Sequence, residues 1–242
     1  MNSTISISPK KIFQVLTFVV FCLIVLSLIG QFFKYVLGYN NALGFVPLTD
    51  VNAEANVPAW FSGGLLLFCS LLLVVIAALK KTSSDRYFRH WLGLSLIFAY
   101  LSLDEVTQLH ERTIMPLRTS LKATGLLYST WVLLGATFVG IVLLTYWKFL
   151  AHLPAKMRRL FLLSGAIYVG GAIGVELAHG YYLNFYGKDM GYALIATVEE
   201  FCEMMGIILF IYTLLSYIKE IGDVYIRIES KKVATRSASR NN

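Results

Sequence analysis

The chain has 242 residues, of which 57% are hydrophobic and 14% are charged, and its mean hydropathy is +0.67. These values exclude an ordinary soluble domain and indicate a membrane protein. The net charge of +7 arises from 21 basic and 14 acidic residues. Membrane topology accounts for this excess, as described below, so nucleic acid is not required as a partner.

Six apolar runs are long enough to cross the roughly 30 Å hydrocarbon core of a bilayer as helices. A membrane segment must satisfy its own backbone hydrogen bonds, so helices are the expected structure. The predicted fold is all-α, with one six-helix transmembrane domain at residues 1–219 and a basic, disordered tail at residues 220–242. The predicted spans are residues 12–37, 58–79, 91–115, 128–150, 159–183 and 191–218.

Lys and Arg are distributed unequally between the two sides of this topology. If the N-terminus is inside, 16 of the 21 basic residues fall on the inner side. Cytoplasmic loops retain positive charge during insertion, so both termini are predicted to be cytoplasmic. The basic tail is expected to lie near anionic headgroups, which makes membrane lipids the first predicted partners.

Half of the acidic residues lie inside the predicted spans. A carboxylate at the bilayer centre costs about 2.5–3.5 kcal/mol on insertion scales, and such residues normally mark a functional site. At about 1.5 Å per residue, three helices bring these acids to one layer in the outer third of the bilayer. They are Asp104, Glu105, Glu111, Glu176, Glu199, Glu200 and Glu203.

The spacing of these acids groups them on helix faces together with two histidines. Glu176 and His179 form Glu-x-x-His, one helical turn apart, and Glu199 and Glu200 precede Glu203 by about one turn. One face of the third predicted helix carries Asp104, Thr107, Gln108 and Glu111.

A divalent metal explains why so many acids occupy one layer, because it neutralises carboxylates, and Glu with His is a ligand set of iron, zinc or manganese. The Glu-x-x-His motif is similar to that of di-iron carboxylate bundles, although those bundles carry two copies. The predicted ligands of one or two ions are His110, Glu111, Glu176, His179, Glu200 and Glu203. Further candidate ligands are Asp104, Gln108 and Glu54, and the candidate proton shuttles are Glu105 and Glu199.

The connection between the first two spans, residues 47–58, is also polar. Asp50, Asn52, Glu54 and Asn56 alternate along it, and they would point the same way in an extended chain. Two interpretations remain open, a lid over the acidic layer and an ordinary polar connection. Asn56 before Pro58 predicts the start of the second helix.

The string Ser102-Leu-Asp-Glu-Val-Thr-Gln-Leu-His-Glu111, preceded by Asp50-Val-Asn-Ala-Glu-Ala-Asn-Val-Pro-Ala-Trp60, resembles a pattern found in uncharacterised bacterial membrane proteins. The resemblance implies a six-span protein of the bacterial inner membrane and carries no activity. With the charge distribution above, the acidic layer would face the periplasm.

Three functions fit these patterns. The first is a membrane metalloenzyme, an oxidase, hydroxylase or hydrolase, acting on an apolar small molecule or a lipid. The second is a transporter or channel for protons or cations, which would require acids throughout the depth of the membrane. The third is a non-catalytic sensor or assembly subunit. The pattern predicts no oligomeric state.

Overall fold

The computed structural model describes residues 8–53 and 55–222, and the regular secondary structure of this part is entirely helical. Five helices are long and apolar enough to cross a membrane. A sixth span is obtained if the bent pair Phe88–Thr107 and Glu111–Leu121 counts as one. The prediction of an all-α chain with membrane-length helices is confirmed. The predicted disordered tail lies, from residue 223 onward, outside the described residues.

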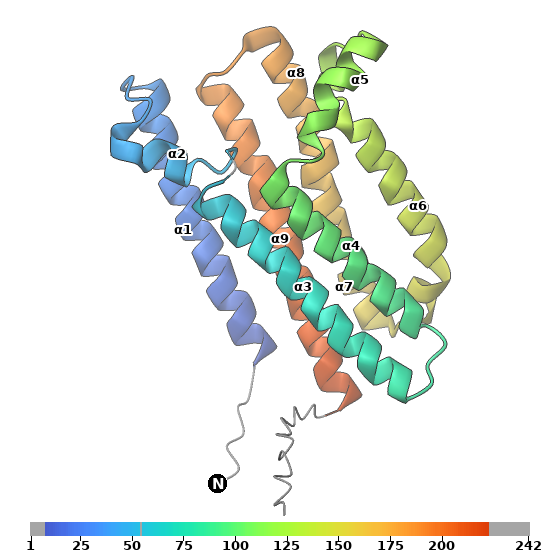
Figure 1. The fold of residues 1–242 in the computed structure, drawn as a ribbon. Helices are drawn as coiled ribbons and strands as arrows, with labels where there is room; N and C mark the ends of the chain where they lie inside the picture. Colours follow the sequence, from blue (N-terminus) through green and yellow to red (C-terminus); the bar gives the residue numbers. More distant parts are fainter. Residues whose placement is uncertain (1–7, 54, 223–242) are drawn as a thin grey trace, which may run out of the picture.

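The bundle is built from long helices that are joined at its two ends (Figure 1). Its helices are α1 (Pro9–Tyr35), α3 (Val57–Thr82), α4 (Phe88–Thr107), α6 (Trp131–His152), α7 (Ala155–Val169), α8 (Glu176–Tyr186) and α9 (Met190–Ile221). A π-helix, η4 (Gly170–Val175), joins α7 to α8. The connections hold the short helices η1 (Ala42–Gly44), α2 (Phe45–Thr49), η2 (Glu111–Thr113), α5 (Ile114–Leu121) and η3 (Gly125–Leu127).

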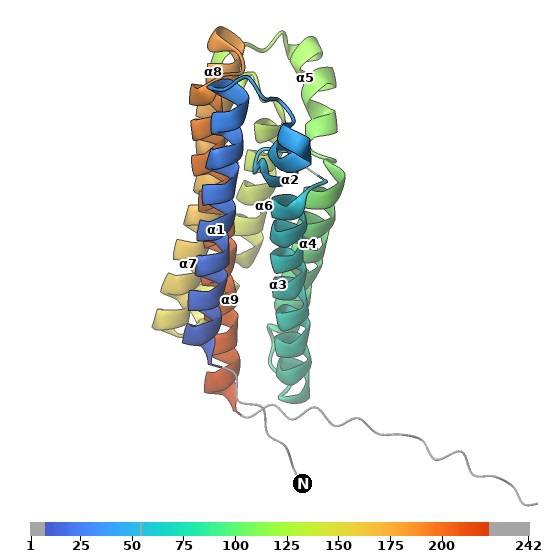
Figure 2. The ribbon, with the colours of Figure 1, turned by 90° about the vertical axis from the view of Figure 1, so that its left-hand side faces the viewer.

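Helix α9 lies at the centre of the bundle. It packs against α1, α3 and α7, while α3 and α4 pack closely on each other. Figures 1 and 2 show α3 and α4 in one layer, α1, α9 and α7 in another, and α6 at one edge. The lower half of α9 is buried on several sides, with Met204, Ile208 and Ile211 fully inaccessible. The core below the acidic residues is therefore apolar.

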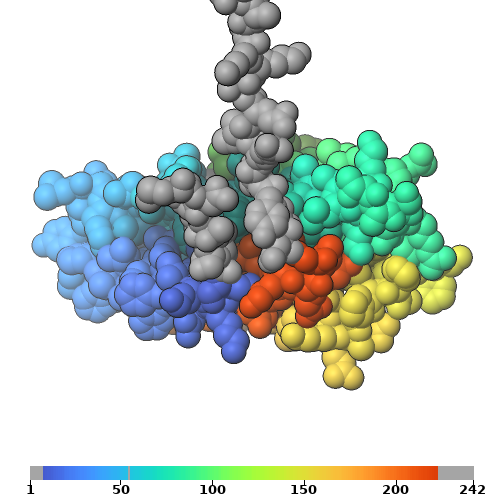
Figure 3. Space-filling model, turned by 90° about the horizontal axis from the view of Figure 1, so that it is seen from below, coloured from blue at the N-terminus to red at the C-terminus, as the bar shows by residue number. Residues whose placement is uncertain are grey.

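The two ends of the bundle differ in charge. The start of α1, the α3–α4 and α6–α7 connections and the end of α9 meet at one end, seen from below in Figure 3. This end carries Lys80, Lys81, Arg86, Arg89, Lys156 and Arg158. The opposite end holds α2, α5 and the α8–α9 connection. The basic residues that the sequence analysis assigns to the inner side thus gather at one end of the bundle. The side of a membrane that each end faces stays a prediction.

Helix α4 ends at Thr107, within the span predicted at residues 91–115. Gln108 adopts a left-handed conformation (φ +56°), and the following helical segment is bent from α4 by 69°. The Asp104 carboxylate accepts hydrogen bonds from the His110 backbone N–H (3.0 Å) and interacts with its ring Nδ1 (2.7 Å). Local bonds of this kind compete with helix continuation. The prediction that Glu111 shares a helix face with Asp104 is therefore wrong.

Helix α3 begins where the sequence predicts, and Asn56 is its N-cap. The Asn56 side chain accepts a hydrogen bond from the Ala59 N–H (3.1 Å) and donates to the carbonyl oxygens of Asp50 (2.7 Å) and Pro47 (3.2 Å). We expect Asn56→Ala to lower the free energy of unfolding by about 1–3 kcal/mol, because the cap, one buried and one partly buried hydrogen bond are lost. Thermal unfolding of the purified protein would measure this change. Asn56→Ser keeps an uncharged cap acceptor and should cost less; an equal cost would contradict the capping role.

Candidate metal centre

A cavity of about 230 Å³ lies between α4, α6, the α7–α8 span and α9. It belongs to the half of the bundle nearer α5 and α8, since Glu199 is only about 14 Å along α9 from its start. Seven carboxylates line it: Asp104, Glu105, Glu111, Glu176, Glu199, Glu200 and Glu203. Six of these acids lie on the three helices α4, α8 and α9, as the sequence predicts, whereas Glu111 lies on η2.

Positive charge around this cavity is scarce. Among the described lining residues Arg118 is the single Lys or Arg. Its Nε donates to the Tyr128 carbonyl oxygen (2.7 Å), and its guanidinium lies 3.5 Å from the centre of the Tyr128 ring. One arginine cannot balance seven carboxylates. The remaining charge has to be met by protons, the two histidines or a cation.

Three of the lining residues converge on one point. His179 Nδ1 lies 3.1 Å from Glu176 Oε2 and 3.0 Å from Glu199 Oε2. One ligand atom from each residue lies within 4.8 Å of the others, as in a group that can hold a metal ion. All three residues are buried, with exposures of 7–8%. We refer to Glu176, His179 and Glu199 as the Glu-His-Glu triad.

The hydrogen bonds within the triad are incomplete. Glu199 Oε2 is close to His179, but the geometry is not that of a hydrogen bond, and this oxygen has no such partner among the described residues. His179 Nε2 likewise has none. Leaving a buried polar atom unsatisfied costs about 1–3 kcal/mol. A cation between the carboxylates would remove this cost for Glu199.

Neighbouring side chains hold the triad in place. Trp131 Nε1 donates to Glu176 Oε1 (3.2 Å), so the indole fixes one carboxylate. The Tyr192 ring packs against His179 with 4.3 Å between centroids, and its hydroxyl accepts a hydrogen bond from Asn52 Nδ2 (3.0 Å). Such outer contacts orient the ligands of metal sites. Neither Trp131 nor Tyr192 was identified from the sequence, because no spacing rule connects them to the acids.

The connection before α3 covers part of the cavity. Val51, Asn52 and Ala53 line it, as expected of a lid. The predicted alternation is wrong in detail, because residues 51–53 form a turn and their neighbours point elsewhere. Asp50 faces Lys34 (3.6 Å between Oδ2 and Nζ), and Asn56 caps α3. Glu54 lies outside the described residues.

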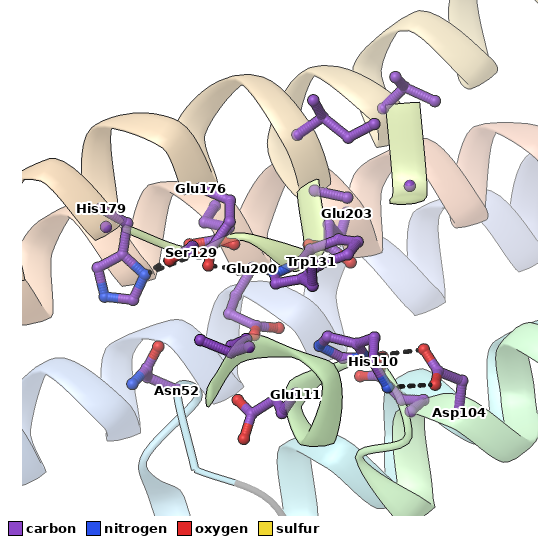
Figure 4. Close-up of a pocket in the computed structure, with 18 of the residues that line it drawn as sticks. Asn52, Asp104, His110, Glu111, Ser129, Trp131, Glu176, His179, Glu200 and Glu203 are labelled. Carbon is purple, nitrogen blue, oxygen red and sulfur yellow. Dashed lines mark hydrogen bonds and ion pairs between the residues drawn. The ribbon is translucent and has the colours of Figure 1, made fainter. Parts of the chain in front are cut away.

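A second polar group lies on the opposite wall of the cavity (Figure 4). It contains Asp104 and His110, joined as described above, and Glu111 from η2. The His110 ring packs on Trp131 with centroids 4.6 Å apart. Trp131 thus contacts both groups.

All six predicted metal ligands line the cavity, but the structure groups them differently from the sequence. Glu176 and His179 converge with Glu199, a predicted proton shuttle, and not with Glu200 or Glu203. Glu105, the other predicted shuttle, and Asp104 also line the cavity. Gln108 is not among the lining residues and sits at the left-handed end of α4.

The π-helix η4 sets the position of the triad. It ends at Val175, immediately before Glu176, and π-turns of this kind are frequent at functional sites. Gly171 within it lies so close to α9 that an added Cβ would be 2.9 Å from the Glu199 carbonyl oxygen. The absence of a side chain at Gly171 therefore allows the two helices that carry the triad to approach.

The acidic cavity has a neighbour between α4 and α6. A further cavity of about 420 Å³ between α4 and α6 shares Asp104, His110 and Trp131 with it. Its remaining walls are mainly apolar and include Leu109 and Leu134, with Thr113 and Tyr100 as the polar members. Polar and apolar side chains thus meet at the level of Asp104 and His110.

Taken together, fold and site define a helical bundle with membrane-length helices and a buried Glu-His-Glu group that can hold a metal ion. The chain belongs to the family described as Domain of unknown function (DUF8692), whose sequence model matches residues 15–218. No curated protein and no solved structure matches it. The resemblance to an uncharacterised family is thereby confirmed, whereas bacterial origin and the motif within residues 102–111 stay predictions.

Proposed function

We propose that this protein is a membrane metalloenzyme whose Glu-His-Glu triad binds a divalent iron, zinc or manganese ion. One observation carries the proposal: two carboxylates and an imidazole converge in a buried site where Glu199 Oε2 has no hydrogen-bond partner among the described residues. Without a metal ion, the two glutamates would repel each other unless one of them or His179, which lies between them, were protonated. A bound cation would balance the charge of both carboxylates and give Glu199 Oε2 a partner.

The arrangement suits a catalytic ion better than a structural one. Three protein ligands leave a coordination position free, and here that position would face the 230 Å³ cavity. A metal in such a site polarises a bound substrate or lowers the pKa of bound water. Glu200, Glu203 and Glu105 line the same cavity and can transfer protons to or from the reacting molecule.

A second ion on the opposite wall would require Asp104, His110 and Glu111 to move together, because among the described residues their ligand atoms do not converge within 4.8 Å as those of the triad do. Carboxylate and imidazole are suitable donors, and two ions would balance more of the seven carboxylates. The substrate would be an apolar molecule or a lipid that enters between α4 and α6. In a bacterial inner membrane with the basic end inside, the site would face the periplasm.

The transport alternative is less well supported by the lining of the bundle. A path for protons or cations would require polar groups on both sides of the acidic layer. Below Glu203, the next cavity is lined by described residues that are apolar except for Ser164, Tyr146 and Tyr168. This lining favours a closed reaction site over a continuous pathway.

Elemental mass spectrometry of the purified protein tests the proposal. Protein purified without chelators should hold about one equivalent of a transition metal, or about two if the second site is filled. Less than about a tenth of an equivalent, also after incubation with Fe²⁺, Zn²⁺ or Mn²⁺, would contradict metal binding.

A further inference from the structure

Directly below the acidic cavity, the same four helices enclose a second and very different space. This cavity, about 170 Å³, lies between α4, α6, α7 and α9. Its walls are made almost entirely of apolar side chains such as Phe98, Val142 and Phe210. We refer to it as the apolar pocket.

The two cavities follow each other along each helix. On α4, Phe98 lines the apolar pocket and Leu101 the acidic cavity; on α9, Ile207 lines the former and Glu203 the latter. Each pair is about one helical turn apart, that is roughly 5 Å along the helix axis. Tyr168 lines both cavities. The apolar pocket thus adjoins the acidic cavity, with Tyr168 at their boundary.

Two glycines shape the apolar pocket. Gly206 allows α9 to lie against α7 at Tyr168, because an added Cβ would be 2.7 Å from the Tyr168 backbone nitrogen. Gly165 has no atom within 4 Å of an added Cβ and is exposed on the outer surface of the bundle. The pocket therefore opens at Gly165 toward the surroundings, which for a membrane-length helix are hydrocarbon chains.

We propose that the apolar pocket holds the hydrocarbon chain of a membrane lipid whose polar head lies in the acidic cavity. The inference rests on the proposed function and specifies its substrate as a single-chain amphiphile with an oxygen-bearing head. The volumes of about 230 and 170 Å³ together reach the roughly 300–1,000 Å³ of typical ligand pockets, which neither reaches alone. The polarity changes at Tyr168, as the polarity of such a molecule changes between head and chain.

A photoreactive hexadecanol with a diazirine in the middle of its chain is a suitable probe, because its neutral hydroxyl head adds no negative charge to the acidic cavity. It would be added to the full-length protein in lipid nanodiscs, illuminated, and the labelled peptides identified by mass spectrometry. The expected labels lie on side chains that line the pocket, namely Phe161, Ser164 and Tyr168 on α7 and Ile207 and Phe210 on α9. Gly165→Phe places a ring where the structure has free space, and it should reduce these labels about tenfold.

Gly140→Phe on α6 is the matched control. Gly140 also has no atom within 4 Å of an added Cβ, and it lines neither cavity. The control should keep wild-type labelling. Gly165→Leu adds a smaller side chain and should also reduce labelling, but by less. This variant replaces Gly165→Phe in the test if Gly165→Phe does not fold. Labels confined to the outer surface of the bundle, or unchanged by both Gly165 substitutions, would overturn the inference.

Metal content separates this inference from the proposed function. Both Gly165 variants should retain wild-type metal, because Gly165 is remote from the triad and lines only the apolar pocket. Specific labelling of a wild-type protein that holds no metal would support the chain site and contradict the metalloenzyme. Bound metal without labelling of α7 and α9 would contradict the chain site alone.

Discussion

Glu199→Gln is expected to abolish metal binding by the purified protein. The change preserves the volume of a buried side chain but removes a negative charge that faces His179 Nδ1 at 3.0 Å. Changes outside the ligand shell of metal sites already cost about 10–100-fold in affinity, so loss of a charged ligand should cost more than about 100-fold. Elemental analysis and titration with Fe²⁺ or Zn²⁺ would measure this loss.

Glu200→Gln provides the comparison at the adjacent position. Glu200 lines the same cavity but is not part of the triad, so this variant should retain metal at the first site. His179→Ala should behave like Glu199→Gln. The opposite result, with metal lost in Glu200→Gln and kept in Glu199→Gln, would favour the ligand set predicted from spacing.

Gly171→Ala is expected to lower both stability and metal content. An added methyl group would lie 2.9 Å from the Glu199 carbonyl oxygen and 2.9 Å from Cys202 Cβ, so η4 and α9 would have to separate. Overpacking of this kind costs about 1–3 kcal/mol. Because the backbone of Glu199 is one of the contacted groups, the spacing of the triad should change as well. Thermal unfolding and metal content, measured on the same preparation, would show both effects.

The neighbouring glycines make this test specific. An added Cβ at Gly170 or Gly174 meets no atom within 4 Å. Gly170→Ala and Gly174→Ala should therefore leave stability and metal content close to wild type. If all three variants behaved alike, helix propensity within the π-helix, and not contact with α9, would be the cause.

The long helices were predictable because apolar length alone identifies a membrane-length segment. The end of α4 was not predictable in this way, because the hydropathy of residues 91–115 does not reveal that Asp104 binds the backbone and ring of His110. With these two local interactions, the chain turns at Gln108, and Glu111 lies in the separate short helix η2. A carboxylate can act as a ligand or as a structural acceptor, and its position in the sequence does not distinguish the two roles.

The composition of the site was largely predictable, whereas its pairing was not. The depth of the acids on α4, α8 and α9 follows from the rise of a helix, and these acids line one cavity. Glu111 reaches the cavity from η2, beyond the end of α4, where this argument does not apply. Which acid meets His179 depends on the rotation of α9 relative to α8, and Glu199, Glu200 and Glu203 lie within about one turn of each other. The rotation is set by the contact at Gly171, which no periodicity in the sequence indicates.

The extra residue of the π-helix η4 determines the direction in which the Glu-x-x-His motif points. A π-turn contains one residue more than the corresponding α-turn, so the helix above Val175 is rotated by about 100° relative to an uninterrupted α7. A homologous chain that lacked one residue between Gly170 and Val175 would keep its Glu-x-x-His motif but direct it away from α9. An alignment gap in this segment would thus separate family members that can assemble the triad from those that have lost it.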